Sequence, residues 1–266
     1  MPFFENQDIN FFYEIEGEGF PFLFIHGLGG SIEANKYIIE KLKDVQKIYM
    51  DMRGHGRTYP LGPKEHLNFK QFSEDAHNLI NHLNIKKIIM GGISMGSAVS
   101  IRFALRFPKL VKNLILIRPA WLNKKNPGNL HFFKLVSDLI KNYSPHEAVD
   151  HLSRNPEFKN LKGEYPAAAE SLTRQIFSEK AREYYYRLVA MPSSVPYNDP
   201  YELNQLKTRT LIIGTEQDPI HPFTIAKELA DQIPNATLYK VISKSENLNM
   251  HINQIKKIIT NFISEI

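Results

Sequence analysis

The serine of one glycine-flanked pentapeptide has the neighbours of an enzymatic nucleophile. The pentapeptide follows a short apolar run, precedes a helical pattern and reads Gly92-Ile93-Ser94-Met95-Gly96. In a tight strand-to-helix turn of this type the serine hydroxyl points into solvent, and glycines flank it because side chains there would clash. A phosphate-binding loop beginning at Gly91 is the competing interpretation, but Ser97 stands where that motif needs lysine. We therefore expect Ser94 to attack a substrate carbonyl.

A second glycine-rich segment has the composition to bind the oxygen of such a carbonyl. It follows the apolar run at 21–25 and reads His26-Gly27-Leu28-Gly29-Gly30. Glycines let backbone N–H groups approach a substrate oxygen closely, so we expect the amides of Leu28 and Met95 to form an oxyanion hole. His26 is expected to organise this loop rather than carry a proton. His26 and Trp121 are also weak candidates for lining a substrate pocket.

Short apolar runs alternate with helical patterns along most of the chain, which predicts the scaffold for these residues. The runs cover residues 9–15, 21–25, 45–50, 87–93, 114–117, 210–213 and 236–242, and the helical patterns cover 32–42, 69–83, 98–107, 225–233 and 250–263. Continuous apolar runs separated by amphipathic helices are typical of a mostly parallel sheet with helices on both faces. The first two runs have no helix between them, so we expect them to form an antiparallel start.

One long segment interrupts this alternation. Residues 122–205 contain no convincing strand, but they contain helical patterns at 130–141, after Ser144, and at 167–191. We interpret this segment as a helical cap on the ligand-binding edge of the sheet. The expected domains are therefore an α/β core of residues 1–121 and 206–266 and a cap of residues 122–205.

The order of the motifs resembles the α/β-hydrolase superfamily over nearly the whole chain. A third motif, which we expect to be scaffold, lies between the two already described and reads Asp51-Met52-Arg53-Gly54-His55-Gly56. The resemblance implies an eight-stranded α/β sheet, a lid and a serine–histidine–acid triad. It does not imply a substrate, because this fold carries many chemistries.

The resemblance assigns the acid of the triad to Asp218. This residue lies in the loop after the run at 210–213, where the acid of similar proteins orients the histidine. Glu216 is the rival carboxylate, but it lies nearer the end of the strand and fits the pattern less well. Some family members place the acid after the sixth strand, where this chain reads Ile117-Arg118-Pro119 and offers no carboxylate.

The histidine is where the chain departs from the family pattern. Similar proteins carry it just after the last strand, and aligning the final helix places it near Ser245. The nearest histidine is His251, which shares a helical stripe with Ile255 and Phe262 and should face the protein body. We expect His251 to be the base. His221, three residues after Asp218, is an alternative, although its closeness to the acid loop argues against its bridging that loop to Ser94. The absence of a base is a third possibility.

Composition narrows the classes of function. The 266 residues are 42% hydrophobic and include no cysteine, which excludes disulfides, thiolate metal sites and a cysteine nucleophile. The net charge of +5 is scattered rather than clustered, so we expect no nucleic-acid partner. The absence of a signal-like start and of an uninterrupted apolar stretch of ~20 residues predicts a cytoplasmic protein without a membrane partner. The histidine spacings predict no metal site.

These expectations combine into a carboxylesterase-like serine hydrolase with Ser94, His251 and Asp218 as its triad. It would cleave an ester or related acyl bond of a small, largely apolar substrate through an acyl-enzyme, with no cofactor. Three alternatives remain: a catalytically weak ligand-binding protein, a carbon–carbon bond hydrolase and a cofactor-free peroxidase. The oligomeric state stays open.

Overall fold

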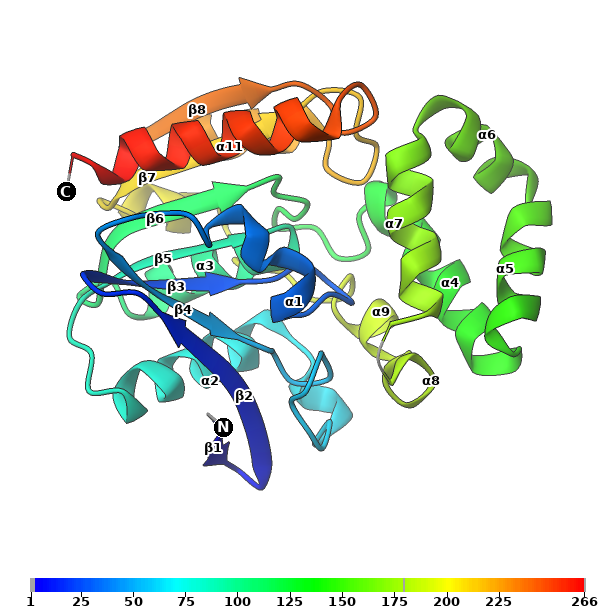
Figure 1. The fold of residues 1–266 in the computed structure, drawn as a ribbon, viewed down its shortest axis with the longest axis horizontal. Helices are drawn as coiled ribbons and strands as arrows, with labels where there is room; N and C mark the ends of the chain where they lie inside the picture. The colour runs from blue at the N-terminus through cyan, green and yellow to red at the C-terminus, as the bar shows by residue number, and fades with distance from the viewer. Residues whose placement is uncertain (1–2, 179, 266) are drawn as a thin grey trace.

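An eight-stranded sheet forms the centre of the molecule (Figure 1). The computed structural model describes residues 3–178 and 180–265. The strand order is β1-β2-β4-β3-β5-β6-β7-β8, with β1 and β2 antiparallel to their neighbours and all the other pairs parallel. The strands are β1 (Phe3–Asn6), β2 (Ile9–Glu16), β3 (Phe20–Ile25), β4 (Val45–Met50), β5 (Ile88–Ile93), β6 (Val111–Ile117), β7 (Arg209–Thr215) and β8 (Ala236–Val241). The expected α/β sheet is confirmed.

The start of the sheet differs in detail from the expectation. The first two predicted runs are β2 and β3, and they run in opposite directions, but β4 lies between them. The expected antiparallel start is therefore present, with β2 joined to the parallel strands through β4 rather than through β3. Strand β1 was missed altogether, since its four residues are too few for an alternating pattern to emerge.

Helices cover both faces of the sheet because the central strands bury both of their sides. In β3, Leu23 and Ile25 belong to one apolar cluster, whereas Phe22 and Phe24 belong to the other. The first cluster includes residues of α2 (Phe69–His82), α3 (Met95–Arg106) and α10 (Phe223–Gln232). The second includes residues of α1 (Ile32–Asn35), the short helix η1 (Lys36–Ile38) and α11 (Leu248–Ile263). The sheet therefore has an apolar core on each side.

A group of helices lies between β6 and β7, in the segment where a cap is expected. After the short helix η3 (Gly128–Leu130) come α4 (His131–Asn142), α5 (Pro145–Arg154), α6 (Pro156–Glu164), α7 (Pro166–Ile176), α8 (Ala181–Tyr184) and α9 (Arg187–Ala190), and η4 (Pro200–Gln205) precedes β7. Figure 1 shows α4 to α9 beyond one end of the strands rather than over a face. The helix predicted at 167–191 is in fact three helices, and α6 was not predicted.

Prolines mark the boundaries between these helices. Pro145, Pro156 and Pro166 each occupy the first turn of a helix, where the missing N–H costs nothing. Helix α5 also begins with a capping box, in which the Ser144 hydroxyl and the Glu147 carboxylate bond to each other's backbone N–H groups. The chain is thereby broken into short helices that fold over the end of the sheet.

The same helices are tied to the loops at the carboxyl ends of the strands. The side-chain amide of Gln175 in α7 donates to the Leu28 carbonyl at 3.2 Å, and the Arg187 guanidinium of α9 donates to the Gly54 carbonyl. The N–H of Phe69, the first residue of α2, donates to the Ser194 hydroxyl at 3.1 Å. The glycine-rich loops are thus held between sheet and helices.

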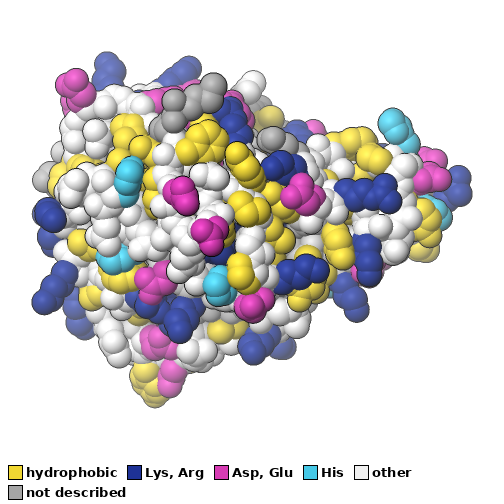
Figure 2. Space-filling view, turned by 90° about the horizontal axis from the view of Figure 1, so that it is seen from below, with side chains coloured by type: hydrophobic (Ala, Val, Ile, Leu, Met, Phe, Trp, Pro, Cys, Tyr) yellow, Lys and Arg dark blue, Asp and Glu magenta, His cyan; other side chains and the backbone are white. Residues whose placement is uncertain are grey.

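The surface carries charges of both signs. Figure 2 shows lysine and arginine side chains interspersed with aspartate and glutamate on the face in view. Within residues 3–178 and 180–265, none of the helices has the length and apolar character that crossing a lipid bilayer requires.

Candidate active site

Ser94 sits at a sharp turn between β5 and α3. Its backbone is strained for a non-glycine residue, with φ of 56° and ψ of −113°, and its N–H donates to the Ile117 carbonyl at 2.9 Å. Glycine is required on either side of the turn. A Cβ at Gly96 would overlap the Ile25 carbonyl, and one at Gly92 would lie 2.7 Å from that same oxygen. The strand–turn–helix geometry that the sequence predicts is present.

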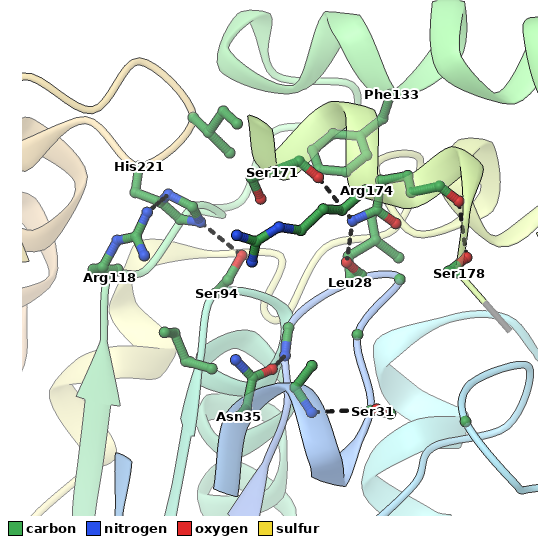
Figure 3. Close-up of a pocket in the computed structure, with 18 of the residues that line it drawn as sticks. Leu28, Ser31, Asn35, Ser94, Arg118, Phe133, Ser171, Arg174, Ser178 and His221 are labelled. Carbon is green, nitrogen blue, oxygen red and sulfur yellow. Dashed lines mark hydrogen bonds between the residues drawn. The ribbon is translucent and has the colours of Figure 1, made fainter. Parts of the chain in front are cut away.

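The imidazole that lies against Ser94 belongs to His221. Its Nε2 atom is 2.8 Å from Ser94 Oγ (Figure 3). Its Nδ1 atom is 3.0 Å from Asp218 Oδ2. His221 and Asp218 both lie in the loop between β7 and α10. The three side chains form a continuous chain of contacts from carboxylate to hydroxyl, so Asp218 is where the sequence places the acid.

His251 occupies a different place from the one the sequence analysis gives it. Its side chain does face the protein body, but its Nδ1 atom lies 2.6 Å from the Ile242 carbonyl oxygen. The residue is 1% exposed, and burial lowers its pKa to about 4. The structure therefore contradicts the expectation that His251 reaches Ser94. Helix α11 begins at Leu248, so His251 is held in its first turn against the end of β8.

A tight turn explains how His221 reaches the serine from a position so near the acid. The N–H groups of Ile220 and His221 each lie 3.2 Å from Asp218 Oδ1, and the His221 N–H is also 3.2 Å from the Asp218 carbonyl oxygen. The backbone thereby folds around the carboxylate and turns the imidazole back over it. The sequence analysis set His221 aside because a separation of three residues gave no sign of this turn.

Arg118 is the fourth member of the cluster. It follows β6 directly, is 7% exposed and forms an ion pair with Asp218 Oδ2, to which its Nε also donates at 3.1 Å. Burial opposes ionisation of Asp218, but the charges of Arg118 and His221 and their hydrogen bonds outweigh it and hold the pKa of Asp218 well below its usual value. The carboxylate is therefore ionised at neutral pH.

His221 is neutral at the same pH. Burial lowers its pKa below the usual 6.5, and Arg118 lowers it further, against the opposing effect of Asp218. The Arg118 Nη2 atom also lies 3.0 Å from His221 Nδ1. Because guanidinium can only donate and carboxylate can only accept, a proton on Nδ1 favours the contact with Asp218. In that tautomer Nε2 is free to accept the proton of the Ser94 hydroxyl.

The loop that contains Leu28 runs beside the serine. A Cβ at Gly27 would lie 3.5 Å from the Cβ of Ser94. Among the hydrogen bonds of the described residues, none has the N–H of Leu28 or of Met95 as its donor to a loop or side-chain acceptor. Met95 is the first residue of α3, where N–H groups lack helical partners. Both amides are thus available for an oxygen bound near Ser94 Oγ.

His26 is a structural residue of this loop. Its Nδ1 lies 2.8 Å from the Gly27 carbonyl oxygen, and its Nε2 accepts from the Met52 N–H at 3.1 Å. Burial lowers its pKa to about 4. Trp121 is 1% exposed and packs edge-on against Phe69. Neither His26 nor Trp121 lines the cavity at Ser94, which corrects the expectation that they contribute to a substrate pocket.

A cavity of about 310 Å³ opens at the serine. Figure 3 shows Ser94 and His221 on the side of the sheet, with Phe133, Ser171 and Arg174 opposite them on the helices between β6 and β7. The cavity lining differs from the apolar pocket that the sequence analysis expects, because it contains four charged side chains and all of them are cations. These cations are Arg118, Arg174, Arg187 and Lys244.

Two of these cations lie at or next to positions that the sequence analysis considered for members of the triad. Arg118 follows the sixth strand, where some family members carry the acid of the triad. This chain therefore has a positive charge at a position where those proteins have a negative one. Lys244 lies one residue before Ser245, where the alignment of the last helix places the family histidine. Within the described residues, no group of three or more histidine, aspartate or glutamate side chains is arranged to hold a metal ion.

Comparison with known proteins agrees with this architecture. A profile of the alpha/beta hydrolase fold family matches residues 21–251, which is most of the chain. The chain belongs to the α/β-hydrolase family. Its similarity to the AB hydrolase superfamily protein YisY of Bacillus subtilis is 26% identity over 254 residues, covering 87% of each chain. Its similarity to a putative esterase/lipase of Haemophilus influenzae is 24% over 222 residues, covering 82% of this chain and 74% of that one.

Solved structures of this family share the fold. The enol-lactonase of Burkholderia xenovorans superposes with a TM-score of 0.78 at 18% identity, covering 99% of this chain and 100% of that one. The bromoperoxidase of Bacillus anthracis superposes with a TM-score of 0.74 at 19% identity, covering 96% of each. The names of these α/β-hydrolase relatives include an esterase, a lactonase and a peroxidase, so membership of the family does not fix the reaction.

Proposed function

We propose that this α/β-hydrolase is a serine hydrolase that cleaves an ester or related acyl bond, with His221 in place of His251 as its base. The observation that supports this function most is the 2.8 Å distance between His221 Nε2 and Ser94 Oγ. A neutral imidazole at that distance can accept the hydroxyl proton as the oxygen attacks. The alternative that the chain is a catalytically weak ligand-binding protein depended on the absence of a base, and the position of His221 argues against it.

The reaction would proceed in two halves. Ser94 Oγ attacks the carbonyl carbon while its proton passes to His221 Nε2, and Asp218 stabilises the imidazolium that forms. The amides of Leu28 and Met95 donate to the oxyanion. The tetrahedral intermediate collapses as His221 protonates the leaving alcohol, which leaves an acyl group on Ser94. A water molecule, deprotonated by His221, then hydrolyses this acyl-enzyme.

Labelling with a fluorophosphonate tests the proposal directly, because that reagent reacts only with an activated serine hydroxyl. We expect one adduct at Ser94 in the wild-type protein, located by mass spectrometry of the digest. Hydrolysis of p-nitrophenyl acetate should be lost in Ser94→Ala. Ser97→Ala is the matched control, since Ser97 is fully buried and donates to the carbonyls of Gly92 and Ile117 rather than facing the cavity. Undiminished turnover by Ser94→Ala would refute the proposed function.

A further inference from the structure

The cavity at Ser94 carries positive charge that the residues described by the structure neutralise only in part. Of its four cations, Arg118 pairs with Asp218, and Arg174 pairs with Glu170 on the preceding turn of α7. That leaves Arg187 of α9 and Lys244 of the loop after β8. No aspartate or glutamate is among the described residues that line the cavity.

Arg187 is a buried cation whose partners among the described residues are neutral. It is 1% exposed, and its guanidinium donates to the Gly54 carbonyl and to the Ser178 hydroxyl, the latter at 2.7 Å. Its Nε atom is buried without a hydrogen-bond partner. Burial lowers its pKa to about 10, so it still carries its charge at neutral pH. Keeping a charge buried without a counterion is unfavourable, and an anion in the cavity would relieve that.

Lys244 lines the same cavity and is also without a partner. It is partly buried and has no hydrogen bond or salt bridge to any residue that the structure describes. The charge of Arg118 and burial lower its pKa to about 7, with Arg174 acting in the same direction and Asp218 and Glu170 opposing. A bound anion would restore the protonated form of this lysine.

We infer that the substrate carries an anionic group, a carboxylate, in addition to the bond that is cleaved, and that Lys244 binds this carboxylate, with Arg187 adding positive charge elsewhere in the same cavity. The inference rests on the proposed function for the position of the scissile bond. Both cations and Ser94 line one cavity of about 310 Å³, a volume suited to a small ligand. The substrate class is therefore a small ester or lactone acid rather than the largely apolar ester that the sequence suggests.

A pair of matched esters tests this inference. Monomethyl glutarate and methyl valerate differ in that a terminal carboxylate replaces a methyl group. We expect the wild-type protein to hydrolyse the anionic ester with a kcat/KM at least about ten times that for the neutral ester, because hydrogen bonds to charged groups have this strength. Lys244→Met should lower the ratio about tenfold, mainly by raising the KM of monomethyl glutarate. Equal kcat/KM values for the two esters in the wild-type protein would overturn the inference.

Lys240→Met is the matched control for the lysine. Lys240 lies in β8, four residues before Lys244, and pairs on the surface with Glu216 at 3.3 Å. Its loss removes the same charge from the protein without touching the cavity. The ratio should stay at the wild-type value, and a fall equal to that of Lys244→Met would mean that net charge alone sets the preference.

Calorimetry on Ser94→Ala separates this inference from the proposed function, since binding needs no turnover. We expect monomethyl glutarate to bind at least about ten times more tightly than methyl valerate. The carboxylate site would be overturned if monomethyl glutarate did not bind, or if inorganic phosphate bound and monomethyl glutarate did not. If the carboxylate binds but the wild-type protein hydrolyses neither ester and Ser94 is not labelled, the anion site stands and the hydrolase proposal fails.

Discussion

The guanidinium of Arg118 lies 3.0 Å from Nδ1 of His221, the nitrogen that also faces Asp218 Oδ2. A cation is thus in contact with the imidazole that we propose as the base. This contact disfavours protonation of His221, whereas Asp218 favours it. After burial, which is the larger cause, Arg118 therefore lowers the pKa of His221 and with it the pH at which the proposed base would become protonated.

Replacing Arg118 should move the acidic limb of the pH–activity profile. His221 must be neutral to accept a proton, so kcat/KM falls as the pH drops through its pKa. In Arg118→Met the loss of a neighbouring positive charge raises that pKa, and the limb should shift to higher pH. Arg118→Lys keeps the charge, and its limb should stay near that of the wild-type protein. A profile for Arg118→Met that coincides with the wild-type profile would show that the contact has no electrostatic effect.

The two histidines should respond oppositely to substitution. His221→Ala removes the proposed base, and loss of the histidine from a serine triad costs on the order of 10⁶ in kcat. His251→Ala removes a buried hydrogen bond to Ile242, so it should cost about 1–3 kcal/mol of unfolding free energy while ester hydrolysis continues. Steady-state kinetics and urea unfolding of both variants measure the two effects. Loss of hydrolysis in a folded His251→Ala protein would restore the assignment made from the sequence.

Stability should decline as the pH falls from about 6.5 to about 4. Burial lowers the pKa of His26 and of His251 to about 4 in the folded protein, while both titrate near 6.5 when unfolded. The unfolded chain therefore binds more protons in this range, and each histidine removes up to about 3 kcal/mol as the pH drops through it.

Urea midpoints between pH 7.5 and 4.5 measure this decline. His251→Asn keeps a side-chain N–H for the Ile242 carbonyl but cannot titrate, so its stability should depend less steeply on pH. His146→Asn, at an exposed position of α5, is the control and should follow the wild-type slope. Equal slopes for all three proteins would contradict the role of buried His251.

Two glycine substitutions should have opposite signs. A Cβ at Gly96 would overlap the Ile25 backbone carbonyl, so Gly96→Ala must displace α3 or β3 and should destabilise the protein by several kcal/mol. At Gly163 in α6 nothing lies within 4 Å of an added Cβ, so Gly163→Ala should stabilise the protein by about 0.4–1 kcal/mol. Thermal unfolding of the two variants compares them. An unchanged melting temperature in Gly96→Ala would disprove the close approach at the turn.

The features predicted correctly from the sequence are those that depend on local pattern. The turn around Ser94 needs glycines at fixed positions, and the strands that precede it are apolar runs bounded by helices. Both the turn and the strands can therefore be predicted from the sequence. Asp218 was placed by its position after a strand in a known family order. Each of these predictions depends on residues that are close in sequence, and the structure has the strands and the turn where the sequence predicts them.

The histidine in contact with Ser94 was not predicted, because its position depends on how the chain folds back in three dimensions. His221 reaches Ser94 through a turn stabilised by the Asp218 carboxylate, and no periodic pattern encodes such a turn. His251 satisfied helical periodicity, which predicts the side that a residue faces but not its distance from another element. The cationic lining likewise comes from α7, α9, the residue that follows β6 and the loop after β8, which meet only in the folded protein.

The short spacing between Asp218 and His221 places two members of the proposed relay on one segment. The loop between β8 and α11 then does not have to position a histidine against Ser94. Its residues can change without altering the contacts among Ser94, His221 and Asp218. Under the proposed binding of a carboxylate, substitutions at Lys244 would alter which acids are accepted without changing Asp218 or His221, so the loop after β8 is the place to redesign selectivity.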